Sequence, residues 1–193
     1  MSRGPRVVLL GKQGAGKGTQ AARLAEHYRI NHLATGDLLR AAARAGTELG
    51  QEAGRYMNSG NLVPDGLVVG IVQERFRDED LPARGFVLDG FPRTRPQAEA
   101  LEQALAPESL DIVVDLEIPT DLVLERIAAR KTSERRDDDK DEAIRRRLEL
   151  YELETAPLID FYRRLDHLVE VDAVGEPDEV FKRLVAAIDE RMP

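Results

Sequence analysis

The sequence predicts an α/β fold in which a doubly wound, five-stranded parallel sheet carries helices on both faces. Five short apolar segments have the length and the branched side chains of buried strands, and they lie at residues 6–10, 30–33, 85–90, 111–116 and 167–171. Longer segments with apolar residues at helical spacing separate them. Strands that alternate with helices along a chain are typical of a parallel sheet covered on both sides.

The helical segments account for most of the remaining chain. Turn-forming residues gather in the segment SGNLVPDG at residues 59–66, which separates two of the helices. Pro157 lies inside the longest segment and is expected to bend it. The expected helices cover residues 17–28, 36–45, 47–57, 65–76, 96–105, 120–131, 141–165 and 179–191.

Length and composition restrict the class of protein. A chain of 193 residues with 42% hydrophobic and 33% charged residues suits one soluble domain with a sizeable core. The net charge of −8 argues against non-specific binding of nucleic acid or of an anionic membrane. The absence of cysteine excludes disulfides and cysteine-ligated zinc. The apolar run before the first loop is too short for a signal peptide or a membrane span, so we expect a cytoplasmic protein.

The loop after the first strand has the spacing of a phosphate-binding loop. Gly11, Gly16 and Lys17 fit the pattern G-x-x-x-x-G-K between a strand and a helix. Glycines let the backbone point its N–H groups inward, and the following helix adds the positive end of its dipole. An ordinary glycine-rich turn would not require the lysine, so we interpret the loop as a P-loop for a nucleoside triphosphate. Most P-loops have a magnesium-binding Ser or Thr at the position of Gly18, whereas here the hydroxyl comes one residue later, at Thr19.

Five motifs, in the same order as in a known family, extend this observation over most of the chain. They are GAGKGTQ (14–20), HLATGDLLR (32–40), GNLVPD (60–65), GFVLDGFPRT (85–94) and RRDDDKDEAIRRRL (135–148). Together they resemble the adenylate kinase family, with one departure, since the family commonly has proline at the position of Gln13. The resemblance implies Mg²⁺-dependent phosphoryl transfer from ATP to AMP, giving two ADP, without a nucleophile from the protein. It also implies a role in adenine nucleotide homeostasis.

The resemblance implies a single domain over residues 1–193 with two inserted mobile parts. One is an AMP-binding segment at residues 34–63, and the other is a short lid at residues 129–139. Their closure would exclude water from the reaction. Residues 131–135 of the lid contain neither Cys nor His, so we expect no structural zinc. The expected partners are ATP, AMP and ADP, the expected state is a monomer, and neither nucleic acid nor membrane is an expected partner.

The same resemblance assigns the residues of the site. Gly18 implies that Mg²⁺ is held mainly by phosphate oxygens and water, with Asp89 acting through water. The expected ATP-binding residues are Gly14, Ala15, Gly16, Lys17, Gly18, Thr19, Arg126, Arg130 and Gly175. The expected AMP-binding residues are Thr35, Arg40, Asn61, Leu62, Val63, Gly90, Phe91, Pro92, Arg93, Gln97, Arg136 and Arg147. The catalytic cations would be Lys17, Arg93, Arg130, Arg136 and Arg147, because several fixed guanidinium groups are needed to offset the repulsion between two nucleotides.

Several alternatives stay open at this point. A kinase for UMP, CMP or a non-nucleotide would share the P-loop and the lid, although Thr35 and Gln97 argue for AMP. A non-catalytic nucleotide-binding module would be expected to lack Lys17 or the lid arginines, and none is missing. For single residues, Asp89 could cap a turn and Gln97 could face solvent. The three histidines, His27, His32 and His167, are interpreted as structural. Arg145 and Arg146 are interpreted as residues of a solvated helix face, and the role of Arg135 is left undecided.

Overall fold

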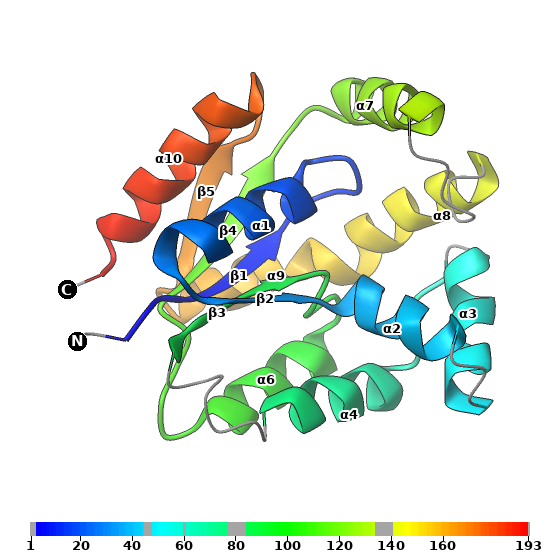
Figure 1. The fold of residues 1–193 in the computed structure, drawn as a ribbon, viewed down its shortest axis with the longest axis horizontal. Helices are drawn as coiled ribbons and strands as arrows, with labels where there is room; N and C mark the ends of the chain where they lie inside the picture. The colour runs from blue at the N-terminus through cyan, green and yellow to red at the C-terminus, as the bar shows by residue number, and fades with distance from the viewer. Residues whose placement is uncertain (1–2, 45–47, 60, 77–83, 134–140, 193) are drawn as a thin grey trace.

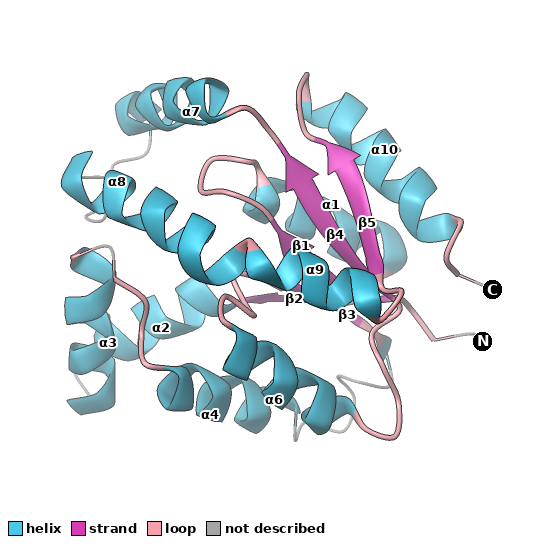
Figure 2. Cartoon of the chain, turned by 180° about the vertical axis from the view of Figure 1, so that it is seen from behind, coloured by secondary structure: helices cyan, strands magenta, loops and turns pink. Residues whose placement is uncertain are grey.

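The computed structural model describes residues 3–44, 48–59, 61–76, 84–133 and 141–192 (Figures 1 and 2). Its five strands pair in parallel throughout, in the order β2-β3-β1-β4-β5. This confirms the predicted doubly wound parallel sheet. The strands are β1 (Arg6–Leu10), β2 (Asn31–Ala34), β3 (Phe86–Asp89), β4 (Ile112–Glu117) and β5 (Leu168–Asp172).

The helices also agree with the sequence prediction to within about a turn at each end, apart from the long helix predicted over residues 141–165. In the described part of the chain, no helix combines the length and the apolar character of a membrane span. The helices are α1 (Lys17–Tyr28), α2 (Thr35–Arg44), α3 (Glu48–Asn58), α4 (Asp65–Phe76), α6 (Arg95–Leu105), α7 (Thr120–Ser133), α8 (Asp141–Leu150), α9 (Pro157–Arg164) and α10 (Pro177–Asp189), with the π-helix η1 (Tyr151–Thr155) between α8 and α9.

Side chains of the central strand β1 point alternately to the two faces of the sheet, and each face is covered by an apolar layer. Val7 and Leu9 point to one face of the sheet, whereas Val8 and Leu10 point to the other. Helices α1 and α10 cover the first face, which Figure 1 shows, and helices α6 and α9 cover the second, which Figure 2 shows. Each strand of this kind is buried on both sides, which explains its continuous apolar sequence.

The predicted single helix over residues 141–165 is wrong in one respect. The chain continues in helical form, but residues 151–155 form a π-helix, in which the N–H of Ala156 donates to the carbonyl of Tyr151 at 2.7 Å. Pro157 then begins α9 rather than bending a longer helix. Proline lacks an N–H and collides with the preceding turn inside an α-helix, so a wider turn directly before it removes the conflict.

The parallel arrangement brings distant loops to one edge of the sheet. The P-loop follows β1, residues 90–94 follow β3, and α2 begins directly at the end of β2. Figure 1 shows α2 and α3 lying beyond this edge, across from α7 and α8. Ligands of doubly wound sheets bind at the carboxyl ends of the strands, so this edge is the expected location of the functional site.

Shortening a buried side chain of β3, which leads into this edge, should destabilise the fold. Leu88 in β3 is fully buried, so we expect Leu88→Ala to lower the free energy of unfolding by about 2–5 kcal/mol, measured by urea denaturation. The matched control is Leu153→Ala, because the Leu153 side chain is 68% exposed. Equal effects of the two substitutions would contradict this description of the core.

Candidate active site

A cleft of about 630 Å³ occupies the carboxyl edge of the sheet. Its walls come from the P-loop, the ends of β2 and β3, the segment after α3, and helices α7 and α8 with η1. Most of the predicted site residues line it: Gly14, Gly16, Lys17, Gly18, Thr19, Thr35, Arg40, Asn61, Leu62, Val63, Asp89, Gly90, Pro92, Arg93, Gln97, Arg126 and Arg147.

Five predicted residues are placed differently or not described. Ala15 and Phe91 are buried below the cleft surface. Gly175 lies beyond the wall of the cleft, where its carbonyl accepts a hydrogen bond from Arg126 Nη2 at 3.2 Å. The side chain of Arg130 and the whole of Arg136 lie outside the described residues, so their predicted roles stay predictions.

The P-loop owes its shape to backbone conformations that favour glycine. Gly14 has φ of +87°, and a Cβ at this position would lie 3.1 Å from both Ile127 Cγ1 and the Val123 carbonyl oxygen of α7. The N–H of Ala15 donates to the Lys12 carbonyl at 3.1 Å and closes the turn. The loop therefore packs directly against α7, which leaves its inner side open to the cleft.

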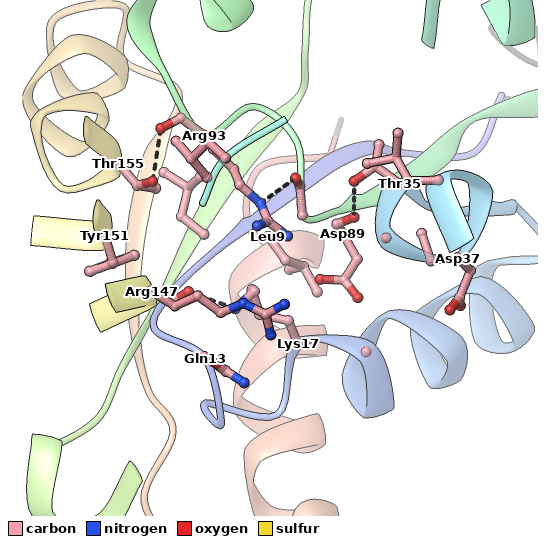
Figure 3. A pocket seen from close by; sticks show the side chains of 18 of the residues that line it. Leu9, Gln13, Lys17, Thr35, Asp37, Asp89, Arg93, Arg147, Tyr151 and Thr155 are labelled. Atoms are coloured by element: carbon pink, nitrogen blue, oxygen red, sulfur yellow. Dashed lines mark hydrogen bonds between the residues drawn. The ribbon is translucent and has the colours of Figure 1, made fainter. Parts of the chain in front are cut away.

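Lys17 begins α1 and folds back over the loop (Figure 3). Its Nζ donates to the carbonyl oxygens of Gly11 at 2.6 Å and Lys12 at 2.9 Å. Desolvation lowers the pKa of Lys17 to about 8, and the carboxylates of Asp89 and Asp115 oppose this decrease. The nearby guanidinium of Arg93 adds to it. An anion in the loop would reverse this balance, since it would favour the charged ammonium.

Asp89 ends β3 beside the P-loop. Thr35 Oγ1 donates to the Asp89 backbone carbonyl at 3.0 Å, so the start of α2 is fixed to the end of β3. A Cβ on Gly18 would lie 3.3 Å from Asp89 Oδ2. The missing side chain at position 18 thus keeps space free next to this carboxylate, where a Ser or Thr would crowd it.

Arginines from two distant parts of the chain converge on the same space as Lys17. Figure 3 shows Arg93 and Arg147 pointing toward Lys17 and Asp89. Arg93 Nε donates to the Gly90 carbonyl at 2.8 Å, and Arg147 Nη2 donates to the Met57 carbonyl at 3.2 Å. These backbone contacts hold the guanidinium groups at the cleft surface, so the cleft carries concentrated positive charge in an acidic chain.

Gln97 is buried, with only 2% of its surface exposed, which excludes the solvent-facing alternative. Thr94 caps α6 by accepting a hydrogen bond from the Gln97 N–H at 3.4 Å. The cap fixes the first turn of α6, and Gln97 reaches the wall of the cleft from this turn.

Sequence reasoning missed several residues of the cleft wall. Tyr151 and Thr155 follow Arg147 at intervals of four residues, a helical spacing that could have indicated a common face. Thr155 Oγ1 donates to the Arg93 carbonyl at 2.8 Å. His32, interpreted above as structural, also lines the cleft. Arg146 does not line the cleft, but its Nε donates to Oδ1 of the cleft residue Asn61 at 3.2 Å, and its side chain is half exposed as expected.

Comparison with known proteins agrees with this geometry. The family model described as adenylate kinase matches residues 9–167. The chain is 49% identical over 185 residues to an adenylate kinase of Stenotrophomonas maltophilia (strain K279a), covering 95% of the chain and 98% of the relative. It is 48% identical over 185 residues to one of Xylella fastidiosa (strain 9a5c), with the same coverage. The chain belongs to the adenylate kinase family. A more distant adenylate kinase, from Thermodesulfovibrio yellowstonii, is 43% identical over 215 residues and covers 96% of the chain and 100% of the relative.

Membership of the adenylate kinase family makes the chain a P-loop kinase that binds nucleotides, as its motifs predicted. Among the residues that the structure describes, no group of three or more His, Cys, Asp or Glu side chains is arranged to hold a metal ion. Adenylate kinases use ATP together with magnesium.

The lowered pKa of Lys17 predicts a pH dependence of ATP affinity. Below pH 8 the free protein carries the ammonium, and affinity should not change with pH. Above pH 8 the free lysine loses its proton, whereas bound phosphate raises its pKa, so affinity should fall by up to about tenfold per pH unit. Calorimetric titration with a non-hydrolysable ATP analogue between pH 7 and pH 10 measures this.

The control for this measurement is Lys17→Met. The variant should bind the analogue more weakly at pH 7 and lose the decrease in affinity that begins near pH 8. The same decrease in both proteins would assign the titration to another group.

Proposed function

We propose that the chain catalyses reversible, Mg²⁺-dependent transfer of the γ-phosphoryl group of ATP to AMP, giving two ADP, and thereby maintains the balance of adenine nucleotides. One observation carries the proposal: a single cleft joins the P-loop on one side to Thr35 and Arg40 of α2 and Gln97 of α6 on the other. Arg93 and Arg147 point into the space between the two sides (Figure 3). This is the arrangement that a phosphate donor facing a phosphate acceptor requires.

The reaction needs no nucleophile from the protein. An oxygen of the AMP phosphate attacks the γ-phosphorus of ATP, the bond between that phosphorus and the β,γ-bridging oxygen breaks, and ADP leaves with the electron pair. The P-loop N–H groups and Lys17 hold the donor phosphates, and Arg40 and Arg93 hold the acceptor phosphate. Arg147 neutralises charge on the transferring group, together with Arg130 and Arg136. Positioning and charge neutralisation therefore supply the catalysis.

The residues near Gly18 fit a magnesium ion that is bound mainly to nucleotide. Asp89 offers a carboxylate next to the P-loop, and Gly18 leaves space beside it. Asp89 would orient water molecules in the hydration shell, since Mg²⁺ keeps several waters when it binds phosphates. When bound, the ion withdraws negative charge from the β- and γ-phosphate oxygens. Thr19, which carries the hydroxyl that position 18 lacks, lines the same cleft.

The base of the acceptor is proposed to lie against Gln97. The backbone of Asn61, Leu62 and Val63 would complete this pocket, with Leu62 against the ring. An amide side chain pairs with the N6 amino group and the adjacent ring nitrogen of adenine. The predicted monomeric state and cytoplasmic location belong to the same proposal, and light scattering of the purified protein tests the first.

A coupled assay with ATP and a panel of acceptors tests the function. We expect strong preference for AMP over CMP, UMP and GMP, with dAMP as the control for the sugar. Gln97→Ala should reduce this preference by roughly 5–150-fold, which corresponds to a lost polar contact of about 1–3 kcal/mol, and should leave the KM for ATP nearly unchanged. Equal activity of the wild type on AMP and UMP would contradict the assignment of the base but not the phosphoryl transfer.

The arginines of α8 give a second test. Arg147→Ala should lower kcat by about 10²-fold or more and change the KM for AMP far less, because its guanidinium stabilises the transferring group rather than the bound substrate. Arg145→Ala is the matched control, since Arg145 is an exposed neighbour in the same helix. A change confined to KM in Arg147→Ala would show uniform binding instead. We expect Arg136→Ala to resemble Arg147→Ala.

A further inference from the structure

The side-chain amide of Gln97 is held at both ends by other parts of the protein. Its Oε1 accepts the backbone N–H of Arg93 at 2.8 Å, and its Nε2 donates to Asp65 Oδ1 at 2.7 Å. Asp65 is the first residue of α4, whereas Gln97 lies in the first turn of α6. Both views show these two helices side by side (Figures 1 and 2).

These two partners leave the amide only one orientation. A backbone N–H can only donate, and a carboxylate oxygen can only accept. Turning the amide by 180° would place the Nε2 protons against the Arg93 N–H and Oε1 against the Asp65 carboxylate. Both hydrogen bonds would be lost, one of them to an ionised group, and two like-charged contacts would replace them.

Asp65 is itself fixed in position. Thr94 Oγ1 donates to the same Asp65 Oδ1 at 3.0 Å, and the Thr94 side chain is buried. The hydroxyl of Thr94 also caps α6. Asp65, Thr94 and Gln97 therefore form one connected group at the junction of α4 and α6, and the carboxylate oxygen cannot turn away without losing two hydrogen bonds.

The oriented amide of Gln97 can still form two further hydrogen bonds to a ligand. Oε1 keeps a second lone pair and Nε2 keeps a second proton, and Gln97 lines the cleft. Adenine offers an N6–H donor beside the N1 acceptor, which pairs with such an edge when Oε1 faces N6. Hypoxanthine and uracil offer the inverse order, a carbonyl oxygen beside an N–H. A freely turning amide would accept either order, whereas an amide held in one orientation discriminates between them.

We propose that Asp65 is a specificity-positioning residue: it fixes the orientation of the Gln97 amide and so makes the acceptor pocket select the donor–acceptor order of adenine over that of hypoxanthine or uracil. This inference rests on the proposed function, because it takes Gln97 as the residue that contacts the acceptor base. Asp65 itself acts through Gln97 and does not contact the base.

The test compares AMP with IMP, whose hypoxanthine has the same two-ring size but the inverse edge. Initial rates with ATP give kcat/KM for both acceptors in the wild type, Asp65→Asn and Asp65→Ala. Alanine removes the acceptor, whereas asparagine can present either its oxygen or its NH₂ group and so only weakens the constraint. We expect the AMP-to-IMP ratio to fall by about tenfold or more in Asp65→Ala and by less in Asp65→Asn, with the KM for ATP unchanged.

Two controls separate specificity from general damage. Asp160→Asn makes the same change in the first turn of α9, where the exposed Asp160 pairs with Arg163, and it should leave the ratio unchanged. A purely structural role of Asp65 would lower kcat/KM for AMP and IMP equally. An unchanged ratio in Asp65→Ala would overturn the role of Asp65, while the wild-type preference for AMP would still support the proposed function. Absence of transfer to AMP in the wild type would instead overturn the proposed function.

A measurement on the wild type keeps the inference testable if the variants do not fold. In a ¹⁵N-labelled protein, the Gln97 side-chain NH₂ protons should show nuclear Overhauser contacts to the β protons of Asp65, both free and with AMP bound. Contacts of equal strength to the Arg93 amide proton would show that the amide turns freely, and they would overturn the proposal.

Discussion

The parallel pairing of β1 with β3 and β4 is the constraint on which the rest of the site depends. The register places Leu9 opposite Asp89 and Leu10 opposite Asp115, so the strands end at one edge of the sheet. The P-loop and the Gly90–Arg93 turn are about eighty residues apart in the chain, yet they emerge side by side at this edge. Because both faces of each central strand are buried in apolar layers, a one-residue change of register would move every side chain into the opposite layer and disrupt its packing. The relative position of the two loops is therefore fixed by the stability of the core.

The cleft holds positive charge at an energetic cost that an anionic ligand would relieve. Lys17 is desolvated next to Arg93, which lowers the pKa of the ammonium, and the carboxylates of Asp89 and Asp115 only partly compensate. Burial in turn raises the pKa of Asp115, against its hydrogen bond from Tyr151. The free protein thus contains groups that are poorly solvated and incompletely neutralised. The cations among these groups, Lys17 and Arg93, would need little reorganisation to interact with an anionic ligand.

Local sequence patterns were sufficient to predict the helices, the strands and the P-loop, but they did not predict the contacts between helices and strands. Strand and helix positions followed from periodicity, and Gly14 and Lys17 from a short motif, because these signals lie within a few residues. The π-helix could not be predicted, since Tyr151 and Thr155 are held by Asp115 and the Arg93 carbonyl, which lie in other elements. The same limit applies to Gln97, whose partner Asp65 is 32 positions away.

The α8–η1 segment links the two sides of the cleft through one helical face. Arg147 contacts the Met57 carbonyl of α3, Tyr151 contacts Asp115 of the central sheet, and Thr155 contacts the Arg93 carbonyl. The π-helix widens the turn between the last two contacts and lets α9 start at Pro157. A displacement of α8 therefore cannot occur without changing a contact to the acceptor side or to the sheet.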